Sequence, residues 1–243
     1  MIAPHAAATV KVCVVTCTGG RRELFTLCRR WVEHQTVKPD AWVVTDDVGD
    51  MRDLVPVSAT YVRVPVWPEV YDKHPTPGAV WALANALDAV PKDHAVVIME
   101  DDDYYYPQHI EKAVQQLKLH QIVQLRSAWR CHLPAQRIAR ELPAENEAPT
   151  IVQGLSSFRY DSIPHVRDAV SVDPFHKLGI HYYEGDTCVS IKGVGYGLPG
   201  RTGATRKHIP KHRKTLIAQP DPDHSMFKTL LGEHADLYLA LLS

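Results

Sequence analysis

The sequence predicts an α/β domain with a mostly parallel central sheet, and three observations carry this prediction. Short Val-rich runs alternate with longer segments whose apolar residues have helical spacing. The short runs are apolar along their whole length, as in strands that are buried on both faces of a parallel sheet. Several of these runs end in polar clusters, and folds of this class bind ligands at the carboxyl ends of their strands.

The first strand and helix illustrate the pattern. Residues 10–16 (VKVCVVT) form a Val-rich run, and Gly19 and Gly20 interrupt it shortly afterwards. Residues 21–35 then place apolar side chains between Leu24 and Val32 at helical spacing. A buried strand followed by an amphipathic helix is the expected opening of a βαβ unit.

The same alternation continues through the first half of the chain. Further strands are expected at residues 41–45, 60–64 and 95–99. Further helices are expected at residues 78–90 and 107–120. Pro91 ends the first of these helices, and Pro107 is well suited to the first position of the second.

The pattern loosens after about residue 122. Residues 141–150 read as a polar loop, and residues 152–172 could supply short strands. Residues 186–192 are expected to begin a helix, and residues 225–242 have the apolar spacing of one. No internal repeat and no second independent unit is evident, so residues 1–243 are expected to form a single domain.

Composition excludes several classes of protein. The chain is 45% hydrophobic and 23% charged, which is ordinary for a globular domain and argues against disorder. No apolar run approaches 18 to 20 residues, so no membrane span is expected. The five cysteines form no CxxC pair, which disfavours a zinc ribbon. The N-terminus lacks a basic region of the kind found in secretory signals, and we expect a cytoplasmic protein.

The acidic run at residues 100–103 (EDDD) is the strongest chemical signal. Four adjacent carboxylates directly after a buried strand repel one another unless a cation or solvent intervenes. Oxygen ligands of this type suit Mg²⁺ or Mn²⁺. The alternative is a solvated acidic turn near a helix N-terminus. The position at a strand end favours the metal site.

Two blocks of the sequence resemble a known family. The segment VVTCTGGRRELFTLCRRWVEHQTVKPDAWVVTDD is similar to the opening of family 2 glycosyltransferases of the GT-A fold, and VVIMEDDDYYYPQHIEKAV resembles their metal-binding strand end. The resemblance covers about residues 10–117. It implies a GT-A-like fold with a C-terminal extension, with residues 10–120 binding a nucleotide-sugar and residues 121–243 forming the acceptor side. It also implies Mn²⁺ or Mg²⁺, and a nucleotide-sugar donor of which a UDP-sugar is favoured.

The resemblance assigns roles to the acidic run. Glu100 and Asp102 fall on the outer acids of the family's DxD motif, which implies that Asp102 is the principal metal ligand, with Asp103 as a close alternative. Asp101, inside the run, is counted among the donor-binding residues. Enzymes of this fold often take a further ligand from the C-terminal part, for which His208 is the candidate.

The resemblance also implies a nucleotide-binding face. Its candidates follow the first two strands and lie in the second helix: Thr16, Thr18, Arg21 or Arg22, Asp46 or Asp47, and Asn85. The family stretch that ends at Asn85 usually reads Ala-Arg-Asn, whereas this chain has Leu83-Ala84-Asn85. The missing Arg leaves one contact to the diphosphate or base without its usual residue.

An inverting enzyme needs a base for the acceptor hydroxyl. The family's base lies some eighty or more residues past the DxD motif, which selects Asp186 first and Glu184 second. The alternative is that Asp186 only caps a helix, and a retaining enzyme would not need this base. The Gly-rich segment 193–203 is interpreted as a loop that closes over the donor, with Arg201 reaching a phosphate.

The basic segment 201–214 raises the question of the acceptor. From Thr187 to Pro220 the chain has seven Lys or Arg and no acid, so this part can meet either the diphosphate or a polyanion such as DNA. The stretch IKGVGYGLPGRTGATRKH is similar to small glycosyltransferases of bacteriophages, some of which modify hydroxymethylated bases in DNA.

The acceptor suggested on this basis is a hydroxymethylated pyrimidine in DNA, modified in the host cytoplasm. A glycan or lipid acceptor is the first alternative. A nucleotidyltransferase and a non-catalytic DNA-binding protein are alternatives from other classes, and the oligomeric state stays open. A nucleotidyltransferase would be expected to carry a longer Gly-rich signature after its first strand than Gly19-Gly20.

Overall fold

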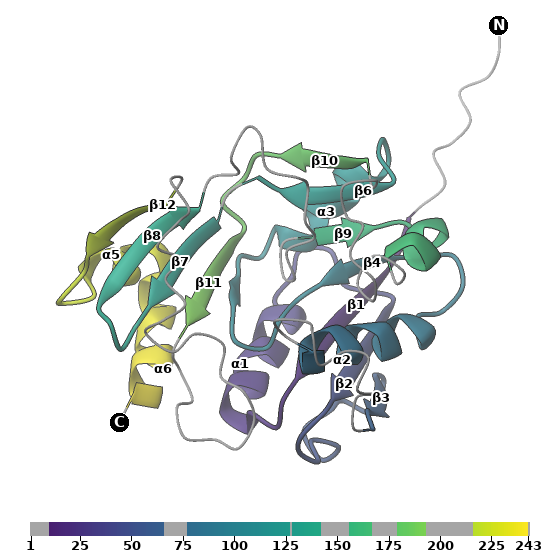
Figure 1. The fold of residues 1–243 in the computed structure, drawn as a ribbon, viewed down its shortest axis with the longest axis horizontal. Coiled ribbons are helices and arrows are strands. Elements are labelled where there is room, and N and C mark those ends of the chain that lie inside the picture. The colour runs from purple at the N-terminus through teal and green to yellow at the C-terminus, as the bar shows by residue number, and fades with distance from the viewer. Residues whose placement is uncertain are drawn as a thin grey trace, which may run out of the picture.

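The computed structural model describes residues 10–65, 77–126, 128–141, 156–166, 179–192 and 216–242. Two sheets organise these residues, and helices pack against both of them (Figure 1). The candidate residues 201–214 and the Gly-rich segment 193–203 lie outside the described residues, and so do Arg201 and His208.

The larger sheet has seven strands in the order β10-β6-β9-β4-β1-β2-β3. Its strands are β1 (Lys11–Thr18), β2 (Ala41–Asp46), β3 (Thr60–Arg63), β4 (His94–Ile98), β6 (Ile122–Leu125), β9 (Ser156–Phe158) and β10 (Ile180–Tyr183). All adjacent pairs are parallel except those that β9 makes with β4 and β6. The predicted α/β fold with a mostly parallel sheet is therefore confirmed.

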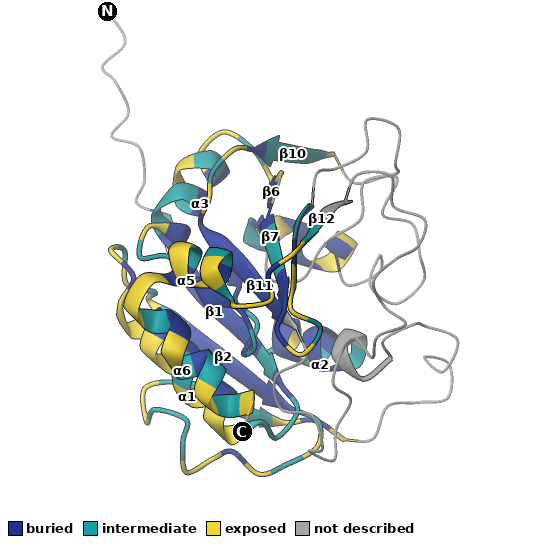
Figure 2. Cartoon of the chain, turned by 90° about the vertical axis from the view of Figure 1, so that its left-hand side faces the viewer, coloured by how far each residue is buried: buried dark blue, intermediate teal, exposed yellow. Residues whose placement is uncertain are grey.

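Helices cover both faces of this sheet, as the burial along β1 shows. Val12 and Val14 point to one face, where they pack with α1 (Arg22–Glu33) and α3 (His109–Leu117). Cys13 and Val15 point to the opposite face, where they pack with α2 (Pro77–Asp88). Strands buried on both sides in this way need the continuous apolar runs that the sequence contains (Figure 2).

The second sheet has five strands in the order β12-β8-β7-β11-β5. They are β5 (Tyr104–Tyr105), β7 (Ala128–His132), β8 (Arg137–Glu141), β11 (Cys188–Lys192) and β12 (Leu216–Pro220). The C-terminal helices α5 (Ser225–Leu231) and α6 (Ala235–Leu239) share a hydrophobic core with this sheet and with α1. Short 3-10 turns lie at Tyr160–Ser162, Gly232–His234 and Ala240–Leu242.

The structure corrects one element. Residues 186–192 were expected to begin a helix, but Cys188–Lys192 form strand β11. This strand is antiparallel to β5 and parallel to β7, and its Val189 and Ile191 are fully buried. Burial between two strands outweighs the weak local preference of this segment. Because no helix begins at Asp186, this residue does not cap one.

The predictions for the other elements are confirmed to within a few residues. The strands expected at residues 10–16, 41–45, 60–64 and 95–99 are β1 to β4, and the helices expected at residues 21–35, 78–90 and 107–120 are α1 to α3. The expected short strands of residues 152–172 include β9, and the C-terminal helical segment forms α5 and α6. Within the described residues, none of the helices has both the length and the apolar character that a membrane crossing requires.

Candidate functional site

The candidate site lies at the carboxyl edge of the central sheet, where β1, β2 and β4 end side by side. The register pairs Thr18 at the end of β1 with Asp46 at the end of β2. β4 ends at Ile98, and the backbone N–H of Met99 still donates to the carbonyl of Val15 at 2.9 Å. The acidic run therefore emerges directly beside the end of β1.

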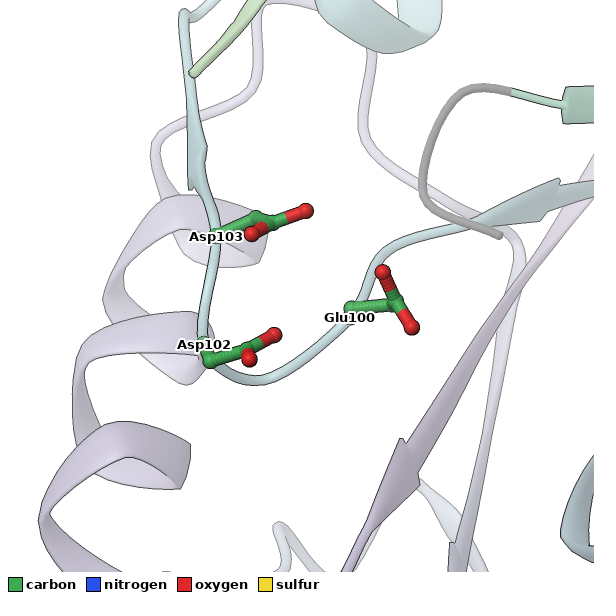
Figure 3. Close-up of side chains that lie close together, drawn as sticks. All are labelled: Glu100, Asp102 and Asp103. Carbon is green, nitrogen blue, oxygen red and sulfur yellow. The ribbon is translucent and has the colours of Figure 1, made fainter. Parts of the chain in front are cut away.

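Three carboxylates of this run converge. Glu100, Asp102 and Asp103 each offer one oxygen, and these oxygens all lie within 4.8 Å of one another. The three side chains project in the same direction from the loop (Figure 3). Asp103 is buried, whereas Glu100 and Asp102 are half-buried and accessible from outside. Oxygen donors at this spacing fit a hard cation such as Mn²⁺ or Mg²⁺. The structure thus brings together the three acids that the sequence predicts as metal ligands.

Hydrogen bonds from three directions fix the backbone and side chains of this acidic loop. The carboxylate of Asp103 accepts a hydrogen bond of 2.9 Å from the backbone N–H of Ile191 in β11. The carbonyl of Asp103 accepts one of 3.2 Å from the hydroxyl of Tyr238 in α6. The backbone N–H of Glu100 donates to the hydroxyl of Tyr105 at 2.7 Å. The second sheet and the C-terminal helix therefore hold a loop that begins in the first sheet.

Asp101 does not belong to the three converging carboxylates, because residues at the end of β1 and in the loop that follows it bind its side chain. This carboxylate is fully buried and accepts a hydrogen bond of 2.7 Å from the hydroxyl of Thr18. Arg21 donates to it from both Nε and Nη2. Burial raises the pKa of Asp101 to about 6, although the Arg21 guanidinium acts in the opposite direction. Asp101 therefore anchors the acidic loop to the loop that follows β1.

Arg21 also reaches the three converging carboxylates of Glu100, Asp102 and Asp103. Its Nη1 lies 3.3 Å from a carboxylate oxygen of Asp102. Burial alone would lower the pKa of Arg21, but the carboxylates of Asp101 and Asp102 raise it above its ordinary value. A permanently charged guanidinium thus lies at the side of the cluster, where it offsets part of the repulsion between the acids.

Asp46 shapes the loop after β2. It is fully buried, and one of its oxygens accepts hydrogen bonds from the backbone N–H groups of Val48 (3.2 Å) and Gly49 (3.0 Å). Its other oxygen accepts a hydrogen bond of 3.2 Å from the hydroxyl of Tyr61. Asp47 is half-buried and lies beside Gly19, where an added β-carbon would come within 3.4 Å of its carboxylate. The structure therefore brings Asp47 to the loop that follows β1.

The loops after β1 and β2 touch at two glycines. Gly20 has a φ of +72°, a left-handed conformation that favours glycine. A β-carbon built on Gly49 would lie 2.9 Å from the Cα of Gly20. This close approach fixes the two loops against each other at the rim of the candidate site.

The side chains of Thr16 and Asn85 bind partners in the core and within a helix. Thr16 is fully buried, accepts a hydrogen bond of 3.0 Å from the indole of Trp42 and lies 3.8 Å from the thiol of Cys28. Its side chain thus belongs to the core on the α1 face. The Asn85 amide donates within α2 to the carbonyl of Trp81 at 2.8 Å.

Asp186 and Glu184 lie toward the opposite end of β11 from Ile191, the residue that binds Asp103. The strand spans about 10 Å between Cys188 and Ile191, and Asp186 lies two residues beyond its start. Both acids are exposed and pair with arginines, Asp186 with Arg140 at 3.6 Å and Glu184 with Arg126 at 3.2 Å. Neither acid therefore belongs to the group of converging carboxylates found among the described residues.

Several groups that build the site were not predicted from the sequence. The N–H of Ile191 and the hydroxyl of Tyr238 come from elements that follow the acidic run by 88 and 135 residues. Nothing in local spacing points to contacts at this separation. Tyr105 belongs to the aromatic run that directly follows the acids, so its nearness to them could be predicted. Its hydrogen bond with the backbone N–H of Glu100 could not.

Comparison with known proteins gives a partial sequence match. No known family model matches the chain. Over 109 residues, which are 45% of the chain, it is 27% identical to the uncharacterized glycosyltransferase YwdF of Bacillus subtilis (strain 168). The match covers only 39% of that relative's length.

Solved structures agree on the fold. The chain resembles S. aureus TarS 1-349 in complex with UDP-GlcNAc, with a TM-score of 0.51 and 13% identity over 76% of this chain and 60% of that one. It also resembles the mannosyltransferase PcManGT from Pyrobaculum calidifontis in complex with GDP-Man and Mn²⁺, with a TM-score of 0.50 and 15% identity over 77% of this chain and 58% of that one. The chain therefore has the fold of the GT-A glycosyltransferases, and it spans less than two thirds of these relatives.

Proposed function

We propose that this protein is a metal-dependent glycosyltransferase that moves a sugar from a nucleotide-sugar to an acceptor hydroxyl. The observation that carries the proposal is the convergence of Glu100, Asp102 and Asp103 at the carboxyl edge of a GT-A-type sheet. Ligands of open α/β sheets bind at this edge. A UDP-sugar is the favoured donor, and the complexes of the two solved relatives, with UDP-GlcNAc and with GDP-Man, are in keeping with a nucleotide-sugar.

The three carboxylates would hold Mn²⁺ or Mg²⁺. A cation bound there supplies positive charge to the diphosphate leaving group. Asp102 is the principal ligand in this proposal because its carboxylate is accessible from outside and flanked by Arg21. Asp103 completes the set from a buried position, and its orientation is fixed by Ile191.

The nucleoside would lie against the loops that follow β1 and β2. Thr18 and Arg21 bind Asp101 and so define the wall of the site next to the acids. Asp47 is the better candidate of the two acids for a contact with ribose or base, because it is half-buried beside Gly19, whereas Asp46 is fully buried. Thr16 is not part of the proposed site, since its side chain lies in the core.

Other parts of the proposed site rest on the sequence alone. Arg201 would contact a phosphate and His208 would add a metal ligand. Asp186 and Glu184 are the sequence-based candidates for the acceptor base. Their exposure and their pairs with arginines at the far end of β11 disfavour this role, and the substitution of Asp186 tests it directly. For the acceptor itself we propose a hydroxymethylated pyrimidine in DNA, supported by the basic segment 201–214. Glycan and lipid hydroxyls are the alternatives.

The test is the release of nucleoside diphosphate in the presence of Mn²⁺, with UDP-sugars and GDP-sugars screened as donors. The unmodified protein is compared with Asp102→Asn and with a matched control, Asp161→Asn, whose carboxylate is exposed on a 3-10 turn. We expect release to require Mn²⁺, to fall about 100-fold or more in Asp102→Asn, and to stay unchanged in Asp161→Asn. Release that ignores both Mn²⁺ and Asp102 would overturn the proposal.

The acceptor is tested in the same assay. Stimulation by hydroxymethylated DNA, but not by unmodified DNA, would support the DNA acceptor. Metal-dependent release without this stimulation would keep the glycosyltransferase and exclude this acceptor. Formation of a nucleotide-sugar from a nucleoside triphosphate and a sugar phosphate would favour a nucleotidyltransferase. Tight DNA binding without turnover of any donor would favour a binding protein.

A further inference from the structure

The C-terminal helix α6 reaches the acidic loop through one side chain. Tyr238 is fully buried, and its hydroxyl lies between two partners. It accepts a hydrogen bond of 2.7 Å from the indole N–H of Trp31 in α1 and donates one of 3.2 Å to the backbone carbonyl of Asp103. The hydroxyl proton is directed to the carbonyl because that oxygen can only accept.

Aromatic packing holds this hydroxyl in place. The Tyr238 ring is stacked on Trp31, with centroids 6.3 Å apart and planes inclined by 19°. Trp31 meets Tyr104, the residue after Asp103, edge to face at 4.9 Å. His234 packs against both Trp31 and Tyr104. The segment that follows the acids is therefore packed against the same aromatic group that holds Tyr238.

Asp103 is thus fixed at two points. Ile191 binds its carboxylate and Tyr238 binds its carbonyl, so neither the side chain nor the backbone can rotate alone without losing a buried hydrogen bond. Groups that orient a metal ligand affect metal affinity even though they do not touch the ion.

We propose that Tyr238 is a positioning residue for the metal-binding loop. Its hydroxyl fixes the backbone of Asp103 and so keeps the carboxylate of Asp103 in register with those of Glu100 and Asp102. This inference rests on the proposed metal site and adds Tyr238, from the C-terminal helix α6, as a residue that orients one of its ligands. Removing the Tyr238 hydroxyl therefore lowers the affinity of the protein for the metal. Removing a similar hydroxyl that does not bind the acidic loop has a smaller effect on this affinity.

The chain offers a matched control in Tyr106. Its hydroxyl also ties the C-terminal segment to the body of the domain, by donating to the carbonyl of Leu230, but it does not bind the acidic loop in the described structure. Tyr238→Phe and Tyr106→Phe each remove one such hydrogen bond. Both should lower the melting temperature, but Tyr238→Phe alone should weaken metal binding.

The measurement is the dissociation constant for Mn²⁺, obtained from the electron paramagnetic resonance signal of free Mn²⁺ with and without UDP. We expect Tyr238→Phe to raise the dissociation constant about 10-fold and Tyr106→Phe to leave it unchanged. Equal affinity in Tyr238→Phe and the unmodified protein would overturn the inference, and so would equal weakening by both substitutions.

A second pair of variants covers the case in which Tyr238→Phe does not fold. That substitution leaves the indole N–H of Trp31 buried without its acceptor, whereas replacing both partners is better tolerated. Trp31→Phe keeps the hydroxyl on Asp103, and the double variant Trp31→Phe/Tyr238→Phe removes it. The double variant should bind Mn²⁺ about 10-fold more weakly than Trp31→Phe, and equal affinities would contradict the proposal.

The two proposals fail in different ways. If the unmodified protein binds Mn²⁺ but releases no diphosphate from any donor, the proposed function is wrong. The Mn²⁺ dissociation constants of Tyr238→Phe and Tyr106→Phe still test the positioning role in that case. If it releases diphosphate and Tyr238→Phe binds Mn²⁺ normally, only the positioning role fails. If the unmodified protein does not bind Mn²⁺ even with UDP, the metal site is wrong, and the role of Tyr238 is wrong with it.

Discussion

Arg21 and Asp101 form a buried ion pair that joins the loop after β1 to the loop after β4. The guanidinium donates to both oxygens of the carboxylate, across 80 residues of sequence. Asp101 is fully buried, so the pair is shielded from solvent. The pair therefore links the loop that is proposed to face the nucleotide with the acids that are proposed to hold the metal.

Removing Arg21 should destabilise the fold. Arg21→Ala leaves the Asp101 carboxylate buried without its cation, which costs about 3 to 5 kcal/mol of unfolding free energy. The neighbouring Arg22 pairs with Asp53 on the exposed surface, so Arg22→Ala is the matched control and should have a much smaller effect. Urea denaturation of both variants measures the difference. Equal losses would show that the buried pair contributes no more than the exposed one.

The contact between Gly20 and Gly49 should not accept a β-carbon. In Gly20→Ala the left-handed conformation costs about 1 to 2 kcal/mol, and in Gly49→Ala the methyl group meets the backbone of Gly20. No atom of the described residues lies within 4 Å of a β-carbon built on Gly179, so Gly179→Ala is the control and should be neutral or slightly stabilising. Thermal unfolding compares the three variants. A wild-type melting temperature for Gly49→Ala would mean that the two loops separate easily.

Burial of His109 should make the protein less stable at acidic pH. Burial lowers the pKa of His109 from 6.5 to about 4, and the hydrogen bond with Thr187 only partly opposes this. Above pH 6.5 the imidazole is neutral in both the folded and the unfolded chain. Between pH 6.5 and 4 only the unfolded chain gains the proton. The free energy of unfolding therefore decreases as the pH is lowered, by about 3 kcal/mol at pH 4.

The check is the free energy of unfolding measured from pH 7 to pH 4. In His109→Asn this residue no longer titrates, so the decrease should become smaller. His165 is exposed, and His165→Asn is the matched control for the loss of one histidine. If the unmodified protein and His109→Asn lose stability in parallel, His109 is not the group responsible.

Substitution of Asp186 tests the sequence-based assignment of the acceptor base. A general base contributes about 100-fold or more to the rate. Because Asp186 lies beyond the far end of β11 and pairs with Arg140, we expect Asp186→Asn to retain sugar transfer within about tenfold. Glu184→Gln is the companion variant, since Glu184 makes a similar pair with Arg126. A 100-fold loss confined to Asp186→Asn would identify it as the base after all.

Local sequence patterns predict the first half of the fold well. β1 and β4 are continuous apolar runs, and α1 has a clear apolar face, so each element carries its own signal. The second sheet carries a weaker signal, because β7 (AWRCH) and β8 (RIARE) place charged residues among apolar ones and form no continuous apolar run. β11 was mistaken for a helix because its strand character depends on β5 and β7 at either side.

The candidate site divides in the same way. The convergence of Glu100, Asp102 and Asp103 follows from their position at the end of β4, which a sequence can show. The burial of Asp46 among loop N–H groups, and the loss of Thr16 to the core, depend on the direction of individual side chains. Spacing along the chain does not determine that direction.

The bond from Tyr238 to Asp103 has a consequence for synthesis of the protein. The two residues are 135 positions apart, so a ribosome that adds about 5 to 20 residues per second needs about 7 to 27 s to pass from one to the other. During that interval β1, β2 and β4 are already made, but the acidic loop has no anchor from α6. The loop that carries the proposed metal ligands therefore gains this anchor only when the last part of the chain has been made.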